Sequence, residues 1–267
     1  MITPDIQIPQ PSVNSGSLRG LGSLLAGSLN IYKNKLALFL SLSLISLVPY
    51  TLASLLYTLN GFIYLAGAVI AVAFFFIGQG GIYFAAKNYQ SKISIGQALN
   101  FGLKKSPYYL WTMILSGLLS SLGFVLFIIP GLILSTWFAF APAILVDEDI
   151  RGTRAILKSK YYVQNFGMAI FGRIFCVGFL IGILSFLEGL LTKGLSGQLV
   201  SILDTVLAVL TLPLFAIFTY ELYTDVKARK NSALFQSSST SRALIIIGAA
   251  IGLIVLVVLF ILRLLKG

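Results

Sequence analysis

The stretch FIIPGLILSTWFAFAP, residues 127–142, places a Pro-Gly pair in the middle of a long apolar run. No charged residue lies between positions 106 and 146. As a single helix this run would be about 60 Å long at about 1.5 Å per residue, roughly twice the thickness of a bilayer core. A single span is too short to contain the whole run, so the chain must reverse direction within the run. The sequence therefore predicts a hairpin of two membrane spans.

Pro130 and Gly131 are the expected turn of this hairpin. Proline has no N–H to donate, and glycine tolerates a left-handed backbone, so the pair favours a chain reversal. The second arm, 132–146, would be only about 22 Å long against a bilayer core of about 30 Å. It either continues past Asp147 or is partly re-entrant.

Composition identifies the class of protein. The chain has 267 residues, of which 58% are hydrophobic and 10% charged, too few polar residues to cover a soluble globule of this size. Besides the two arms of the hairpin, long apolar runs occupy residues 36–59, 62–86, 166–191, 199–223 and 243–262. The sequence therefore predicts an all-α polytopic membrane protein with seven spans.

Short turns containing glycine join the spans in pairs. Gly61 follows Asn60 between the first two spans, and Gly194 follows Lys193 between the fifth and sixth. We expect three helical hairpins from six spans, followed by a C-terminal seventh span. The expected domains are a disordered tail at 1–16, a six-span membrane domain at 17–225, a cytoplasmic linker at 226–242 and the last helix at 243–267.

Lysine and arginine are distributed unevenly between the two ends of the predicted spans. Four segments on one side carry nearly all of them: Arg19, Lys33 and Lys35; Lys87, Lys92, Lys104 and Lys105; Arg151, Arg154, Lys158 and Lys160; Lys227, Arg229, Lys230 and Arg242. Basic residues near span ends are retained in the cytoplasm. We expect a cytoplasmic N-terminus, an external C-terminus and location in the plasma membrane of a prokaryote. The net charge of +11 follows from this asymmetry and favours anionic lipid rather than nucleic acid as partner.

Each hairpin is expected to follow a basic helix that lies in the cytoplasmic interface. Ser94 and Gln97 have the spacing of a capping box at the start of one such helix. The acids 147–149 are expected at the N-terminus of another, where negative charge is favoured. Five basic residues on these helices are the candidate contacts for lipid headgroups: Lys104, Lys105, Arg151, Arg154 and Lys158.

The central sequence IIPGLILSTWFAFAPAILVDEDIRGTRAILKSK resembles the membrane domain of bacterial glycerophosphoryl diester phosphodiesterases and of related stand-alone bacterial multi-pass membrane proteins of unassigned function. The resemblance rests on the turn 129–131, the aromatic span 137–140, the acidic pair Asp147 and Glu148, and the helix 155–159. It implies a membrane domain without the soluble catalytic barrel of those enzymes. That barrel uses histidine and metal-binding carboxylates, and this chain has no histidine.

The residue inventory leaves little for catalysis. Without histidine, the usual general base and the commonest metal ligand are missing, and Cys176 is the only cysteine. We therefore expect no catalytic residue, no metal and no cofactor. The protein is not expected to be an enzyme.

Four residues within the predicted spans are candidates for an intramembrane polar role, and a charge at such a place costs about 2.5 to 3.5 kcal/mol or more. They are Gln79, Arg173, Glu188 and Asp204. Gln79 is expected to form an interhelical hydrogen bond, with ligand binding as the alternative. Arg173 is expected to reach the cytoplasmic interface. Glu188 and Asp204 form either an interfacial cluster with Lys193 or a buried proton or cation site.

Two GxxxG spacings, Gly178 with Gly182 and Gly248 with Gly252, predict close helix packing within the chain. The seventh span is expected to be an anchor, with dimerisation as the alternative. For the whole chain we expect a lipid-interacting or scaffold protein, with a membrane protein or a second copy as a further partner. A small-solute or ion transporter is the alternative, and it would need the four intramembrane polar residues to converge.

Overall fold

The computed structural model describes residues 17–56, 61–230 and 235–264, and all regular secondary structure in these ranges is helical. Seven helical stretches are long and apolar enough to cross a membrane, as the sequence predicts. The spans are α2 (Leu36–Leu56), α3 (Gly61–Lys87), α4 (Ile95–Leu126), α5 (Ile128–Phe138) with α6 (Ala141–Glu148), α8 (Gly167–Leu191), α9 (Gly197–Arg229) and α10 (Ser239–Leu264). The predicted tail at 1–16 lies outside the described residues. The chain is an integral membrane protein of the polytopic all-α class.

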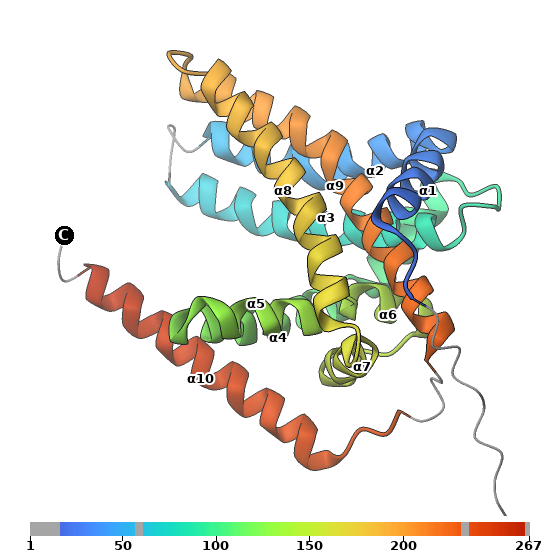
Figure 1. Ribbon diagram of the computed structural model, residues 1–267. Coiled ribbons are helices and arrows are strands. Elements are labelled where there is room, and N and C mark those ends of the chain that lie inside the picture. The colour runs from blue at the N-terminus through green and yellow to red at the C-terminus, as the bar shows by residue number, and fades with distance from the viewer. Residues whose placement is uncertain (1–16, 57–60, 231–234, 265–267) are drawn as a thin grey trace, which may run out of the picture.

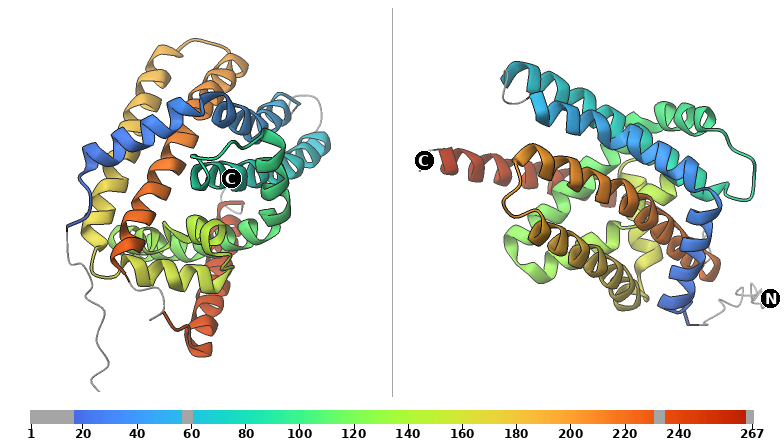
Figure 2. Two further views of the ribbon diagram at one scale, coloured as in Figure 1. Left: turned by 90° about the vertical axis from the view of Figure 1, so that its right-hand side faces the viewer. Right: turned by 90° about the horizontal axis from the view of Figure 1, so that it is seen from above.

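Six of the spans pair as three hairpins. Helices α2 and α3 pack together, as do α4 and α5, and α8 and α9. The turns after α4 and α8 lie on the same side of the bundle as the C-terminal end of α10, at the left of Figure 1. Two shorter helices, α1 (Leu21–Asn34) and α7 (Thr153–Val163), lie at the opposite end. Helix α1 runs across that end of the bundle (Figure 2).

The turn between α4 and α5 is not where the sequence predicts it. Helix α4 ends at Leu126, and the reversal takes place at Phe127, whose backbone is extended. Pro130 and Gly131 lie inside the first turn of α5. The first N–H groups of a helix have no intrahelical partner, so Pro130 costs no hydrogen bond in the first turn of α5. A proline can therefore begin a helix as easily as it ends one.

Gly131 is required for packing rather than for the turn. It is buried against Gly123 of α4, where an added Cβ on Gly123 would lie 2.9 Å from the Gly131 Cα. A Cβ on Gly131 would lie 2.4 Å from the ring of Phe124. The two glycines let α4 and α5 approach closely immediately beside their connection.

The second arm of the hairpin is an interrupted helix. Helix α5 ends at Phe138, and α6 begins at Ala141 with Pro142 in its first turn. The two pieces together give the 21-residue candidate span Ile128–Glu148. The arm therefore continues past Asp147 by one residue, to Glu148, and its second piece is buried from Ala141 to Val146.

The second expected interfacial helix is not separate from its span. The predicted capping box is present, with Gln97 N–H donating to Ser94 Oγ at 3.2 Å and Ser94 N–H donating to the Gln97 side chain at 3.0 Å. From there α4 runs without a break to Leu126, through Pro107. Pro107 cannot donate to the Leu103 carbonyl, and the Ser106 hydroxyl donates to it instead at 3.0 Å.

Replacing Ser94 by alanine is expected to lower the free energy of unfolding by about 1 kcal/mol, because alanine has no oxygen to accept the hydrogen bond from the Gln97 N–H. Reversible unfolding in mixed detergent micelles measures the change. Ser94→Thr keeps a hydroxyl at the cap and should retain most of the stability. Equal losses in both variants would contradict the capping role.

The two GxxxG pairs differ in what they pack against. An added Cβ on Gly248 would lie 2.9 Å from Leu119, and one on Gly252 would lie 2.6 Å from the Leu118 carbonyl oxygen, so α10 packs tightly on α4. By contrast, a Cβ on Gly178 or Gly182 of α8 would meet nothing within 4 Å. The expectation of packing within the chain is confirmed for α10 and is wrong for α8. The predicted linker is also shorter than expected, since α9 extends to Arg229 and α10 begins at Ser239.

Candidate functional site

An acidic pair at the end of α6 holds the basic end of the bundle together. The Asp147 carboxylate pairs with Lys227 at 2.5 Å and with Lys87 at 3.2 Å. The hydroxyl of Tyr223 donates to Asp147 at 3.0 Å and to Glu148 at 2.6 Å. The acids lie at the C-terminus of α6, not at the N-terminus of a helix as predicted. The helix dipole disfavours negative charge there, and the surrounding cations compensate.

The same pair fixes helix α7. Glu148 forms an ion pair with Lys158, whose side chain is 7% exposed. The Tyr162 hydroxyl also donates to Glu148 at 2.8 Å, and Ser159 Oγ accepts a 3.1 Å hydrogen bond from the Phe140 N–H at the break between α5 and α6. These contacts hold one face of α7 against α6.

Lys160 also lies on α7 but takes no part in these contacts to α6. Its ammonium is 4.3 Å from the centre of the Trp137 ring, a cation–π contact at the C-terminal end of α5. The contact connects the linings of two hollows, because Trp137 lines one of them and Lys160 lines the other.

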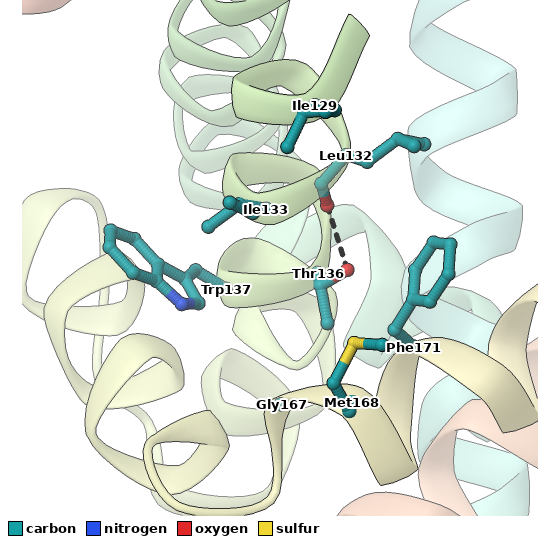
Figure 3. A pocket seen from close by; sticks show the side chains of 8 residues that line it. All are labelled: Ile129, Leu132, Ile133, Thr136, Trp137, Gly167, Met168 and Phe171. Atoms are coloured by element: carbon teal, nitrogen blue, oxygen red, sulfur yellow. Dashed lines mark hydrogen bonds between the residues drawn. The ribbon is translucent and has the colours of Figure 1, made fainter.

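The first hollow is an apolar groove between α5 and the start of α8, with a volume of about 370 Å³. Figure 3 shows its lining, which consists of Ile129, Leu132, Ile133, Thr136, Trp137, Gly167, Met168 and Phe171. The Thr136 hydroxyl donates to the Leu132 carbonyl at 2.8 Å, so it presents no free donor to the groove (Figure 3). Met168 is 84% exposed, so the groove opens on the outer surface of the bundle.

The second hollow is polar and has a volume of about 310 Å³. It lies between α7 and the segment that leads into α10, and its lining consists of Leu157, Lys160, Tyr161, Gln164, Phe235, Gln236, Ser237 and Ser241. Amide and hydroxyl groups and one ammonium can donate hydrogen bonds to an anion here. Together they offer an apolar groove lined by Trp137 and a polar hollow lined by Lys160, and these two residues touch.

The five predicted headgroup residues have different surroundings. Lys104 and Arg154 are exposed. Lys105 and Arg151 pair with Asp149 at 2.6 and 3.1 Å, and hydrogen bonds from Arg151 and then Lys105 hold the pKa of Asp149 below its ordinary value. Arg151 also lies 3.8 Å from the ring of Tyr108. Lys158 is buried in its ion pair with Glu148 of α6. Its ammonium is therefore not available to a lipid headgroup, and the predicted headgroup contact is wrong.

The four intramembrane polar residues do not converge. Arg173 donates to the backbone carbonyls of Leu18 and Arg19 at the basic end, at 3.2 and 2.8 Å. Glu188 lies beside Asp204 across the α8–α9 hairpin, and within the described residues no ion pair joins either acid to Lys193. Gln79 is buried within the bundle, with no hydrogen-bond partner for its Nε2.

Sequence reasoning missed the residues that form the two hollows. In the sequence, Trp137 is one residue of an aromatic span and Lys160 is one of many basic residues. Their contact joins residues from two helices with different axes, so no spacing along the chain signals it. Their positions near the basic ends of α5 and α7 were the only sign available.

Within the described ranges no group of three or more histidine, cysteine, aspartate or glutamate side chains is placed to hold a metal ion. A scan against protein-family models and searches of curated proteins and of solved structures found no match to the chain. The geometry of the hollows is therefore the basis for assigning a function.

Proposed function

We propose that this membrane protein binds an anionic lipid at the two hollows whose linings meet at the contact between Lys160 and Trp137. The observation that carries the proposal is the Lys160–Trp137 contact, with an apolar groove on one side and a polar hollow on the other. A lipid has the same division, with an acyl chain suited to the groove and a charged headgroup suited to the polar hollow. Tryptophan and lysine are the residues that anchor proteins at this depth of a membrane.

Electrostatics supports an anionic headgroup. The net charge of +11 resides mainly in the segments at this end of the bundle, which would face the negative surface of a cytoplasmic leaflet. We therefore propose the plasma membrane of a prokaryote as the location, with the N-terminus inside and the C-terminus outside. The proposed role is that of a lipid-interacting or scaffold protein without catalytic activity. The resemblance to the membrane domain of the phosphodiesterases is part of the same proposal.

The alternative of a small-solute or ion transporter has less support. A transport site needs polar groups gathered near the middle of the membrane. Arg173 instead binds backbone carbonyls near the basic end, and Glu188 lies with Asp204 near the opposite end of α8. A protein partner or a second copy could contact α8, whose Gly178 and Gly182 face open space.

Replacing Lys160 by glutamine is expected to weaken retention of phosphatidylglycerol about tenfold, because one charge-assisted contact to the headgroup is lost. Native mass spectrometry of protein released from nanodiscs measures the bound lipid. Phosphatidylcholine, which carries no net charge, serves as the reference lipid and should be retained weakly by both proteins.

Lys33→Gln is the matched control. It makes the same change at an exposed lysine of α1, at the same end of the bundle, and Lys33 does not border either hollow. Retention of phosphatidylglycerol should stay close to that of the unaltered protein. Equal losses in the two variants would show that only the general basic charge matters, and the proposed site would be wrong.

A further inference from the structure

Another polar hollow lies between the end of α3 and the first turns of α4, apart from the two hollows near Lys160. Its volume is about 460 Å³, within the range of about 300–1,000 Å³ that is usual for small-molecule sites. The connection from α3 to α4 lies at the same end of the bundle as α1 (Figure 1). The hollow, which we call the α3–α4 hollow, therefore belongs to the basic end of the protein.

The walls of the α3–α4 hollow are held in place by contacts within the protein. The rings of Phe84 and Phe101 stack with their centroids 4.4 Å apart and join α3 to α4. The Lys35 ammonium donates to the Ser91 carbonyl at 3.0 Å and ties the connection to the end of α1. The capping box of Ser94 fixes the first turn of α4. The hollow is therefore formed before any ligand binds.

Two lysines that line the α3–α4 hollow have no acidic partner in the described part of the chain. Lys92 and Lys104 are both exposed, and neither takes part in any of its ion pairs. The neighbouring Lys105, by contrast, pairs with Asp149 at 2.6 Å. Among the described residues that line the hollow none is acidic. Two ammonium groups without a carboxylate favour an anionic ligand.

Amide side chains supply neutral hydrogen-bonding groups beside the two lysines. Gln97 Oε1 accepts from the Ser94 N–H, a bond that leaves the NH2 group of Gln97 as a donor. Asn88 Nδ2 donates to the Phe84 carbonyl at 2.9 Å, a bond that leaves the carbonyl oxygen of Asn88 as an acceptor. Asn100 is exposed and has both kinds of group. Hydroxyls, which donate and accept, suit this set of amides.

The apolar part of the lining is small. It consists of Phe84, Ile93 and Phe101, each of which is only partly exposed. The rest of the lining is polar or charged, so a long acyl chain has little apolar surface to contact here. The carbon face of a ring polyol, such as a sugar or a cyclitol, is small enough to pack on such a wall.

We propose that the α3–α4 hollow binds a soluble phosphate monoester of a ring polyol. The phosphate contacts Lys92 and Lys104, and the hydroxyls contact the amides of Gln97, Asn88 and Asn100. A phosphate monoester carries a charge of about −1.5 to −2 at neutral pH, which matches two ammonium groups. The phosphodiester of a membrane lipid carries a single negative charge and matches them less well. The proposal thus assigns Lys104 to a soluble ligand rather than to a lipid headgroup.

Isothermal titration calorimetry of the full-length protein in phosphatidylcholine nanodiscs tests the proposal with three soluble probes. The probes are myo-inositol 1-phosphate, myo-inositol, which lacks the phosphate, and inorganic phosphate, which lacks the hydroxyls. One myo-inositol 1-phosphate per chain is expected, bound about tenfold or more tightly than either of the others, because each of them makes only part of the contacts. Absence of binding, or equal binding of inorganic phosphate, overturns the proposal.

Phosphatidylinositol distinguishes a soluble ligand from a lipid headgroup, because it carries the same inositol phosphate attached to the membrane. Nanodiscs that contain phosphatidylinositol are compared with nanodiscs that contain an equal fraction of phosphatidylserine, which gives the same surface charge. The affinity for free myo-inositol 1-phosphate should be the same in both. A lower affinity with phosphatidylinositol would mean that a lipid headgroup occupies the hollow, and the proposed soluble ligand would be wrong.

Lysine variants then locate the bound phosphate. Lys92→Gln and Lys104→Gln each remove one charge from the lining and should weaken myo-inositol 1-phosphate about tenfold. Both side chains are exposed, so the fold does not depend on them. Lys33→Gln is the matched control, since Lys33 is an exposed lysine of α1 that does not line the hollow. Equal losses in all three variants would show that only the general basic charge acts, and the proposal would fail.

Two further variants test the hydroxyl contacts and the independence of the site. Asn100→Leu keeps the approximate size of the side chain and should weaken myo-inositol 1-phosphate about fivefold. Lys160→Gln should leave this binding unchanged even where it releases phosphatidylglycerol, so the failure of one proposal can be told from the failure of the other. Unchanged binding in Asn100→Leu, or a loss in Lys160→Gln as large as in Lys92→Gln, overturns the proposal.

Discussion

Replacing Glu148 by leucine is expected to lower the free energy of unfolding by about 3–5 kcal/mol, the usual cost of leaving a buried charge without its partner. The Lys158 side chain is 7% exposed and would keep its charge in an apolar setting. The Tyr162 hydroxyl would lose its hydrogen bond to Glu148 at the same time. Reversible unfolding in mixed micelles, followed by circular dichroism, measures the loss.

The double variant Glu148→Leu with Lys158→Leu separates this charge effect from a general loss of packing. Replacing both members of a buried ion pair by apolar residues is often close to neutral. We expect the double variant to recover most of the stability lost in Glu148→Leu. A double variant as unstable as the single one would mean that the ion pair is not what holds α7 on α6.

Replacing Gly102 by alanine is expected to destabilise the protein by about 3 kcal/mol or more, at the upper end of the cost of overpacking. The added Cβ would lie 2.0 Å from the Ile77 carbonyl oxygen of α3. That atom belongs to the backbone and cannot rotate away, so α3 and α4 would have to separate. The same unfolding experiment measures the effect.

Gly117→Ala is the matched control for this prediction, because it makes the same chemical change in the same helix. Its added Cβ would meet nothing within 4 Å. The substitution should leave stability unchanged or raise it by up to about 1 kcal/mol, because alanine restricts the unfolded chain. If both alanine variants were equally unstable, the close approach at Gly102 would not be the cause.

The sequence by itself determined the membrane class, the seven spans and the pairing of six of them into hairpins. The physical reason is that the transfer of apolar residues into a bilayer depends on composition and length along the chain, and both can be counted. The capping box at Ser94 was equally accessible, because its hydrogen bonds join residues three apart.

Only the tertiary structure decided the turn at Phe127, the burial of Lys158 and the unpaired amide of Gln79. A proline near the end of an apolar run fits either the stop of one helix or the first turn of the next, and close packing of Gly131 on Gly123 selects the second. Whether a lysine meets lipid or a carboxylate, and whether a buried amide finds a hydrogen-bond partner, depends on neighbours from distant parts of the chain. Those neighbours are set by how helices pack in three dimensions, which no periodicity in the sequence records.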